Sequence, residues 1–320
     1  MTSRLIYGCM GLGGAWGSSH YTEDDAARAA EAVYAALAIG ITRFDHADIY
    51  RGGTSEAVFG EVLASRPGLR DRIWIQSKVG IRLAERGLGA RYDLSGDAIR
   101  SGVEGILTRL RTDCLDQLLL HRPDPLADPA EVGRAVVRLL DEGLIKGIGV
   151  SNFSGAQMAA LQEHLPVQLA ANQLELSLGR HDFVESGILV NHPEGAAVSF
   201  PHGTLEHCAR VRAEVQAWSP LAGGRFTGRT TPPGDSVGER AEADLATSDL
   251  VARMAQERGT TGEAIVLGWL MRHPAGISPV IGSSTPERIR ACAGAQEVAE
   301  AMTGPEWFAL FTAARGRPIP

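Results

Sequence analysis

Four polar residues that together could deliver a proton follow one another along this chain of 320 residues, each near the end of a short apolar run. They are Asp45, Tyr50, Lys78 and His121. A tyrosine hydroxyl, with an ordinary pKa of about 10, is a weak acid at neutral pH unless a nearby cation stabilises its anion. A lysine does this best when a carboxylate holds it in place. If these side chains converge, we expect Tyr50 to protonate the oxygen of a carbonyl group that is being reduced.

Short apolar runs alternate with amphipathic helical stretches along the chain, which is the pattern of a parallel sheet built from βα units. We expect helices over 24–39, 95–111 and 129–141, with apolar residues on one face and charges on the other. The predicted strands are 4–10, 43–47, 73–78, 115–121, 145–151, 169–174, 215–219 and 277–281.

Helix-capping signals support these boundaries. Asp128 is a predicted N-cap, followed by Pro129 at the first helical position and by Glu131 as the reciprocal acid of a capping box. Gly143 lies just beyond the predicted end of the same helix. Comparable signals predict N-caps at Ser154, Thr261 and Thr285 and a helix end at Gly40.

Eight βα units close most economically into a (β/α)8 barrel, or TIM barrel, and we expect 1–320 to form a single α/β domain of this kind. Reactive groups of such barrels lie at the C-terminal ends of the strands, where the four residues named first fall. Two segments depart from the pattern. Residues 178–203 are expected to be an irregular insertion, and 225–247 either a mobile segment over the barrel mouth or a disordered one.

The composition argues against several kinds of partner. A formal net charge of −7 and a pI of about 5.7 disfavour binding to nucleic acid or to an acidic membrane surface. The four cysteines are widely spaced and contain no Cys-x-x-Cys pair, so neither a metal site nor a disulfide framework is predicted. Without a signal-peptide pattern or a membrane-spanning apolar stretch, we expect a cytoplasmic protein with no obligate protein partner.

Several motifs resemble, in the correct order, the signatures of the aldo-keto reductases. The exact residues in these motifs are similar to those of a bacterial subgroup of general oxidoreductases. The resemblance covers nearly the whole chain. The motifs are Phe44-Asp45-x-Ala47-x-x-Tyr50, Ser77-Lys78, Leu120-His121-Arg122-Pro123-Asp124, Gly147-x-Gly149-Val150-Ser151-Asn152-Phe153, Asn172-Gln173, Trp218-Ser219-Pro220-Leu221 and Ile281-Gly282-Ser283-Ser284.

This resemblance implies the reduction of a small aldehyde or ketone, with a hydride from NADPH and a proton from Tyr50. Lys78 would lower the pKa of Tyr50, Asp45 would pair with Lys78, and His121 would orient the carbonyl group. Trp16 would form an aromatic wall of the substrate pocket together with Tyr50 and His121. No metal is required.

The resemblance also implies a cofactor site. Ser151, Asn152 and Gln173 would hold the nicotinamide carboxamide, and Trp218 would lie against its ring. The segment from Gly282 opens a helix, which favours an anion, and Arg288 would bind the 2′-phosphate. The full predicted set of cofactor residues is Gly11, Ser151, Asn152, Gln173, Trp218, Ser219, Pro220, Leu221, Gly282, Ser283, Ser284 and Arg288.

Other hypotheses stay open on the sequence alone. Trp218 could instead be an aromatic residue of the barrel core, and Arg288 could lie on a solvated helix face. In a Schiff-base aldolase or lyase, Lys78 would attack the carbonyl substrate directly. In a regulatory subunit, the same site would sense NADPH without turnover. The physiological substrate, the oligomeric state and the strength of any preference for NADPH over NADH do not follow from the sequence.

Overall fold

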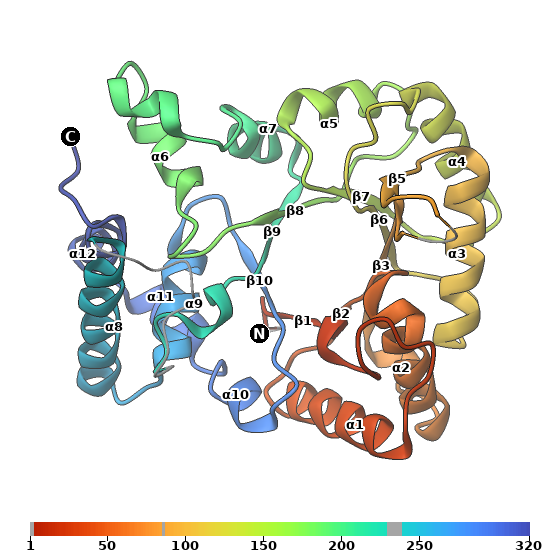
Figure 1. The fold of residues 1–320 in the computed structure, drawn as a ribbon, viewed down its shortest axis with the longest axis horizontal. Helices are drawn as coiled ribbons and strands as arrows, with labels where there is room; N and C mark the ends of the chain where they lie inside the picture. Colours follow the sequence, from red (N-terminus) through yellow and green to blue (C-terminus); the bar gives the residue numbers. More distant parts are fainter. Residues whose placement is uncertain (1–2, 85–86, 229–238) are drawn as a thin grey trace.

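The computed structural model describes residues 3–84, 87–228 and 239–320. Within them, eight parallel strands close into a barrel in the order β1-β10-β9-β8-β7-β6-β3-β2, surrounded by helices (Figure 1). This confirms the predicted single-domain barrel fold and all eight predicted strands. The barrel strands are β1 (Ile6–Gly8), β2 (Arg43–Asp45), β3 (Trp74–Val79), β6 (Gln117–Leu120), β7 (Ile148–Ser151), β8 (Ala171–Glu175), β9 (Glu214–Trp218) and β10 (Ser278–Ile281).

The strands are apolar because helices cover the outside of the barrel while side chains fill its inside. All four residues of β6 and all four of β7 are buried. The pairing register places Asp45 opposite Gln76 and Ser151 opposite Gln173. Polar side chains from four strands are thereby brought to the C-terminal end of the barrel.

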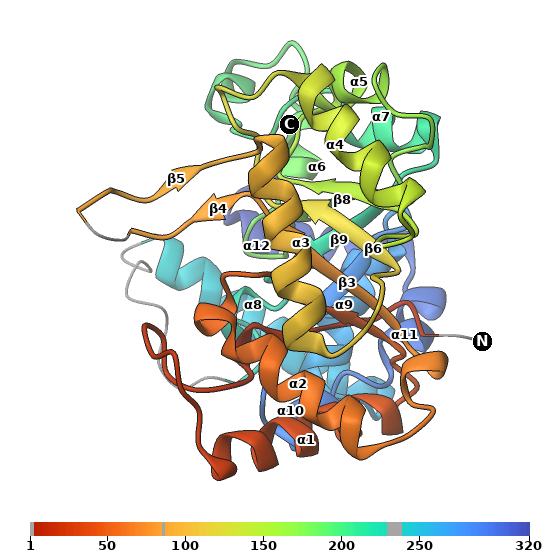
Figure 2. The ribbon, with the colours of Figure 1, turned by 90° about the vertical axis from the view of Figure 1, so that its right-hand side faces the viewer.

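The helices form an outer ring that Figures 1 and 2 show from two directions. The predicted helices appear as α1, α3 and α4, with boundaries within one residue of those expected from the sequence. The helices are α1 (Glu23–Ala38), α2 (Thr54–Ser65), α3 (Gly96–Leu110), α4 (Pro129–Asp141), α5 (Gly155–Gln162), α6 (Asp182–Ile188), α7 (Thr204–Val211), α8 (Glu239–Arg258), α9 (Gly262–Arg272), α10 (Pro286–Arg290), α11 (Ala295–Ala301) and α12 (Gly304–Arg315).

Most of the predicted caps are present. The Asp128 side chain accepts a hydrogen bond from the Ala130 amide, and Ser154 forms a complete capping box with Gln157. The predicted reciprocal role of Glu131 is wrong, because its Oε1 accepts a hydrogen bond from the Gly96 amide of α3 instead. Glu131 therefore links two neighbouring helices.

The other predicted helix ends are confirmed except at Thr285. Thr261 caps α9 through the Ala264 amide, whereas Thr285 precedes α10 without a side-chain cap bond. Gly40 and Gly143 follow α1 and α4 with φ values of 81° and 71°. A left-handed conformation of this kind favours glycine at a helix end.

The prediction of an irregular insertion at 178–203 is wrong in part, because this segment contains α6 and a 3-10 turn over Pro193–Ala197. Glu185 of α6 pairs with Arg315 of α12 at 2.8 Å. The Arg315 side chain is only 2% exposed. The fold of the insertion thus depends on an arginine far away in the sequence.

The second irregular segment, predicted over 225–247, lies partly outside the described residues, at 229–238. From Glu239 onward it forms the first turns of α8, so the expectation of a loop or disorder is wrong there. One pair of strands was not predicted at all. β4 (Ile81–Arg82) and β5 (Arg91–Tyr92) pair antiparallel and project to one side of the barrel in Figure 2.

Across the described parts of the chain, no helix is long and apolar enough to cross a lipid bilayer.

Candidate active site

The four residues predicted to handle the proton converge at the C-terminal end of the barrel. Nζ of Lys78 lies 2.7 Å from each carboxylate oxygen of Asp45 and 3.1 Å from the hydroxyl oxygen of Tyr50. It also donates to the backbone carbonyl of His46 at 2.9 Å. The rings of Tyr50 and His121 meet edge to face, with their centroids 6.1 Å apart. Asp45 and Lys78 come from adjacent strands, and Tyr50 begins the short helical turn after β2.

A layer of buried glutamines supports Asp45 from inside the barrel. Gln76 and Gln173 each donate to Oδ1 of Asp45, at 2.5 and 3.0 Å. Both also donate to Oε1 of Gln216, which returns a hydrogen bond to Oε1 of Gln76 at 3.1 Å. Gln216 in turn donates to Glu214. Because these amide groups hydrogen-bond both to the carboxylate and to one another, the network holds the Asp45 carboxylate in one orientation.

Sequence reasoning did not identify Gln76 or Gln216. A usable signal was present, since each lies two positions before a predicted site residue, Lys78 or Trp218, in the same strand. Alternate residues of a strand face the same side, so both glutamines point into the barrel. A polar residue at an inward position of an apolar strand needs a hydrogen-bonding partner there.

Burial and the Lys78 charge act in opposite directions on Tyr50. Burial raises the pKa of Tyr50 above its ordinary value, while the ammonium group of Lys78 acts to lower it. The net direction is upward, so Tyr50 carries its proton at neutral pH. Burial alone would lower the pKa of Lys78, but the Asp45 carboxylate and the Tyr50 hydroxyl raise it above its ordinary value. Lys78 is therefore a buried cation.

His121 is a neutral imidazole. Burial, followed by the charges of Lys78 and Arg122, lowers its pKa to about 2. Its Nδ1 is buried without a hydrogen-bond partner among the described residues, and the ring lines the cavity described below. A neutral imidazole retains one N–H group, which suits it to donate a hydrogen bond to a carbonyl oxygen.

A second charged cluster lies behind Lys78. The buried Glu56 carboxylate accepts hydrogen bonds from Ser77 at 2.6 Å and from Arg109 at 2.7 Å. Asp48 lies near it, and its Oδ1 has no hydrogen-bond partner in the described chain. Burial, and then the Glu56 charge, raise the pKa of Asp48 to about 7.

A cavity of about 540 Å³ opens above these residues and brings most of the predicted site together. Lys78 does not line it, because it is fully buried beneath Tyr50. The predicted residues that line the cavity are Trp16, Asp45, Tyr50, His121, Ser151, Asn152, Gln173, Trp218, Ser219, Pro220, Leu221, Gly282, Ser283 and Arg288.

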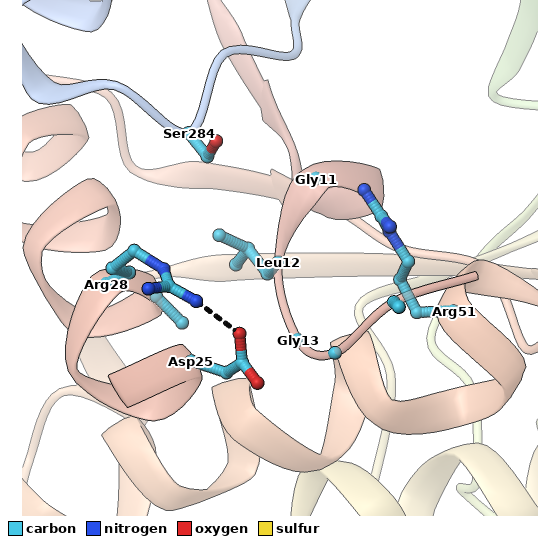
Figure 3. A pocket seen from close by; sticks show the side chains of 10 residues that line it. Gly11, Leu12, Gly13, Asp25, Arg28, Arg51 and Ser284 are labelled. Atoms are coloured by element: carbon cyan, nitrogen blue, oxygen red, sulfur yellow. Dashed lines mark hydrogen bonds and ion pairs between the residues drawn. The ribbon is translucent and has the colours of Figure 1, made fainter. Parts of the chain in front are cut away.

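Two predicted cofactor residues lie elsewhere. Gly11 and Ser284 line a neighbouring, smaller pocket together with Arg28 and Arg51 (Figure 3). The two pockets adjoin, since a Cβ built on Gly11 would lie 3.5 Å from the carbonyl oxygen of Gly282. Arg28 is already paired with Asp25, as the dashed line in Figure 3 marks.

Unsatisfied polar groups in the main cavity fit a dinucleotide such as NADPH. Oε1 of Gln173 accepts no hydrogen bond from the described chain and faces the same cavity as Ser151 and Asn152. The Arg288 guanidinium forms neither a hydrogen bond nor an ion pair with any described residue. A free acceptor and a free cation that line the same cavity suit a carboxamide and a phosphate.

The backbone at this cavity is unusual. Asn152 and Ser219 have φ values of 62° and 52°, and Arg51, next to Tyr50, has 53°. Residues other than glycine rarely adopt this left-handed region, and those that do cluster at functional sites. Nε1 of Trp218 donates to Oδ1 of Asn152 at 3.1 Å, which fixes the indole against the cavity wall.

Several lining residues were not predicted. Met10, Ile49 and Arg122 lie on the side of Tyr50 and His121, while Glu263 and Cys292 lie near Arg288. Loop and helix-end residues of this kind carry no sequence periodicity, so their approach to the cavity depends on the closed barrel. Within the described residues, no cluster of His, Cys, Asp and Glu is arranged to hold a metal ion.

An eight-stranded parallel barrel with a Tyr-Lys-Asp-His group at its C-terminal mouth defines a class of oxidoreductase enzymes. The comparisons with known proteins agree: a model of the Aldo/keto reductase family matches residues 4–302. The chain belongs to this family.

Similar proteins occur in several bacteria. A 6-dehydroglucose reductase of Agrobacterium fabrum is 37% identical over 322 residues, covering 99% of this chain and 96% of that protein. The uncharacterized oxidoreductase YcsN of Bacillus subtilis is 38% identical and covers 88% of this chain and 86% of its own length.

Solved structures show the same fold. A glycerol dehydrogenase of Gluconobacter oxydans superposes with a TM-score of 0.79 at 26% identity, covering 100% of this chain and 94% of that one. An aldo-keto reductase of Klebsiella pneumoniae, determined in complex with NADPH, superposes with a TM-score of 0.72 at 25% identity. The match covers 100% of this chain and 93% of that one.

Proposed function

We propose that this protein reduces an aldehyde or a ketone to an alcohol, with NADPH as the hydride source and Tyr50 as the proton donor. The observation that carries the proposal is the 3.1 Å contact between Nζ of Lys78 and the Tyr50 hydroxyl, at the cavity that Tyr50 and His121 line. Bound NADPH supplies a hydride to the carbonyl carbon.

Tyr50 completes the reaction at the oxygen. As the carbonyl oxygen gains negative charge, the Tyr50 O–H bond breaks and its proton moves to that oxygen, forming the alcohol. The tyrosinate left behind lies beside the Lys78 cation, which stabilises it until a proton returns from solvent. Asp45 keeps Lys78 charged and in place.

His121 acts on the same oxygen. Because its imidazole is neutral and edge-on to the Tyr50 ring, its N–H donates a hydrogen bond to the carbonyl oxygen without competing as an acid. This contact orients the carbonyl group and strengthens as charge develops on the oxygen. Trp16 flanks the substrate.

The cofactor residues divide the cavity into regions. Ser151, Asn152 and Gln173 would hold the carboxamide, and Trp218 would offer its ring to the nicotinamide. Ser219, Pro220 and Leu221 line the same cavity and would also contact the cofactor. Gly282, Ser283 and Arg288 would hold the 2′-phosphate, with Gly11 and Ser284 in the adjoining pocket.

The structure disfavours direct attack by Lys78 on a substrate. A Schiff-base lysine needs an exposed, neutral amine. Lys78 is buried, its Nζ has four oxygen neighbours for three protons, and its pKa is raised rather than lowered. Borohydride added with substrate should therefore trap no covalent adduct.

We also propose the cytoplasm as the location, because Cys9, Cys114, Cys208 and Cys292 are all free thiols. The reaction as proposed needs a small-molecule carbonyl compound and no protein partner.

The proposal is tested by following NADPH oxidation with the purified protein and a panel of aldehydes, ketones and dicarbonyls. The panel includes 6-dehydroglucose, after the name of the Agrobacterium relative. We expect turnover on at least one reactive carbonyl and formation of the matching alcohol. Tight NADPH binding with no turnover on any member would favour the regulatory role instead.

A further inference from the structure

An arginine with no partner lies at the substrate side of the cavity. Arg122 directly follows His121 at the end of β6 and lines the same cavity as Tyr50 and His121. Its guanidinium makes no hydrogen bond and no ion pair with any residue that the structure describes. A partly buried cation without a partner is uncommon, because ion pairs normally offset the cost of removing it from water.

Asp124 and Asp45, two acidic side chains on this side of the barrel, already have other partners. Asp124, two residues on, accepts hydrogen bonds from the amides of Leu126 and Leu94, at 2.9 and 3.0 Å. The Asp45 carboxylate is shared between Lys78 and the glutamine layer. The Arg122 charge is felt at the site, since it is one of the causes that lower the pKa of His121.

Arg122 lies away from the region assigned to the cofactor phosphates. Arg288 follows β10, and the closed barrel separates β6 from β10 by three strands in either direction. Trp16 and Ile49 also line this cavity and offer apolar contacts to the body of a substrate. Arg122 is therefore placed to meet the substrate.

We propose that the preferred substrate is a carbonyl compound that carries an oxyanion, either a carboxylate or a phosphate, and that Arg122 binds this group. A guanidinium presents two parallel N–H donors that match the oxygen pair of such anions. The anion would replace the missing partner while the carbonyl group reaches Tyr50 and His121. This inference rests on the proposed carbonyl reduction and specifies its substrate class.

Two matched substrate pairs test the proposal. The first is 4-carboxybenzaldehyde against its methyl ester, and the second is glyceraldehyde 3-phosphate against glyceraldehyde. For the acidic member of at least one pair, kcat/KM should be higher by about tenfold or more, as expected for hydrogen bonds to a charged group. The pair that shows the preference identifies the anion as carboxylate or phosphate.

The variant Arg122→Gln should remove this preference by raising KM for the acidic substrate. KM for the neutral substrate should stay within about twofold of the wild-type value, because only the contact with the anion is lost. Arg122→Lys should restore part of it. Arg51→Gln is the matched control, because the Arg51 guanidinium already has partners. Its Cζ lies 5.2 Å from the centroid of the Trp16 ring, and its Nε donates a hydrogen bond to the carbonyl of Met10. It should affect both members of a pair alike.

Three results would overturn the inference: neutral substrates used as well as acidic ones, equal losses for both members in Arg122→Gln, or loss of the preference in Arg51→Gln alone. In each of these cases turnover persists and the proposed carbonyl reduction stands. If the protein reduced no carbonyl compound at all, both the proposed carbonyl reduction and this inference would be contradicted.

Discussion

Both carboxylate oxygens of Asp45 lie 2.7 Å from Nζ of Lys78, and both side chains are almost completely buried. Such a pair contributes little net stability, because two charges must leave water for it to form. Removing one partner is much more costly, since the other charge is then left alone in the interior. The pair is thus better explained by what it does for Tyr50 than by stability.

We therefore predict different effects on folding and on activity. Asp45→Asn alone should lower the free energy of unfolding by about 3 kcal/mol or more, because it strands the Lys78 ammonium group. Combining it with Lys78→Met should recover much of this loss. Activity should stay low in both proteins. Urea unfolding and initial rates on the same samples would test this, and a double variant with near-normal kcat would contradict the role of Lys78.

Arg288 should decide between the two nicotinamide cofactors. Arg288→Ala should raise KM for NADPH by about tenfold or more, because charge-assisted hydrogen bonds to the 2′-phosphate are lost. KM for NADH, which lacks that phosphate, should change little. Steady-state kinetics with both cofactors would measure this.

The control for this experiment, Arg290, is two residues away on the same short helix. Arg290→Ala removes an exposed arginine that pairs with Glu287 at 3.5 Å and does not line the cavity. It should leave both KM values unchanged. Equal losses for NADPH and NADH in Arg288→Ala would remove the assigned phosphate role.

Asp48 should make stability depend on pH. Its pKa is raised to about 7 in the folded protein, against about 3.9 when unfolded, so folding favours its protonated form. That contribution is fully present below pH 4 and is lost as the pH rises to 7. The stability advantage of Asp48→Asn, which cannot ionise, over the wild type should therefore grow by about 3 kcal/mol from pH 5 to pH 8.

Thermal unfolding at the two pH values would test this: the gain in Tm over the wild type should grow by roughly 4 °C from pH 5 to pH 8 for a chain of this size. Asp249→Asn, at an exposed position of α8, serves as the control. If the Asp48→Asn difference from wild type were the same at both pH values, the carboxyl group would not be titrating in this range.

Residues at or just after the C-terminal ends of strands could be predicted from the sequence, because a barrel gathers them at one mouth. Tyr50, Lys78, Asp45 and His121 are of this kind, and the structure brings them together. Local caps could be predicted where both partners are close in sequence, as in Ser154 with Gln157.

Features that depend on distant partners could not be predicted. Glu131 has a neighbour three residues away that would complete a capping box, yet it bonds to Gly96, 35 residues earlier. α6 is tied to Arg315, 130 residues from Glu185. Gly11 and Ser284 lie in the adjoining pocket, because the exact path of a loop follows from packing rather than from sequence pattern.

The most direct test of the account is the rate of carbonyl reduction by Tyr50→Phe, measured with NADPH and the best substrate of the panel. The change removes one oxygen, so Tm and the dissociation constant for NADPH should stay close to the wild-type values. kcat/KM should fall about a thousandfold, because phenylalanine has no hydroxyl group with which to protonate the carbonyl oxygen. A variant that folds, binds NADPH and keeps its activity would contradict the assignment of Tyr50 as the proton donor.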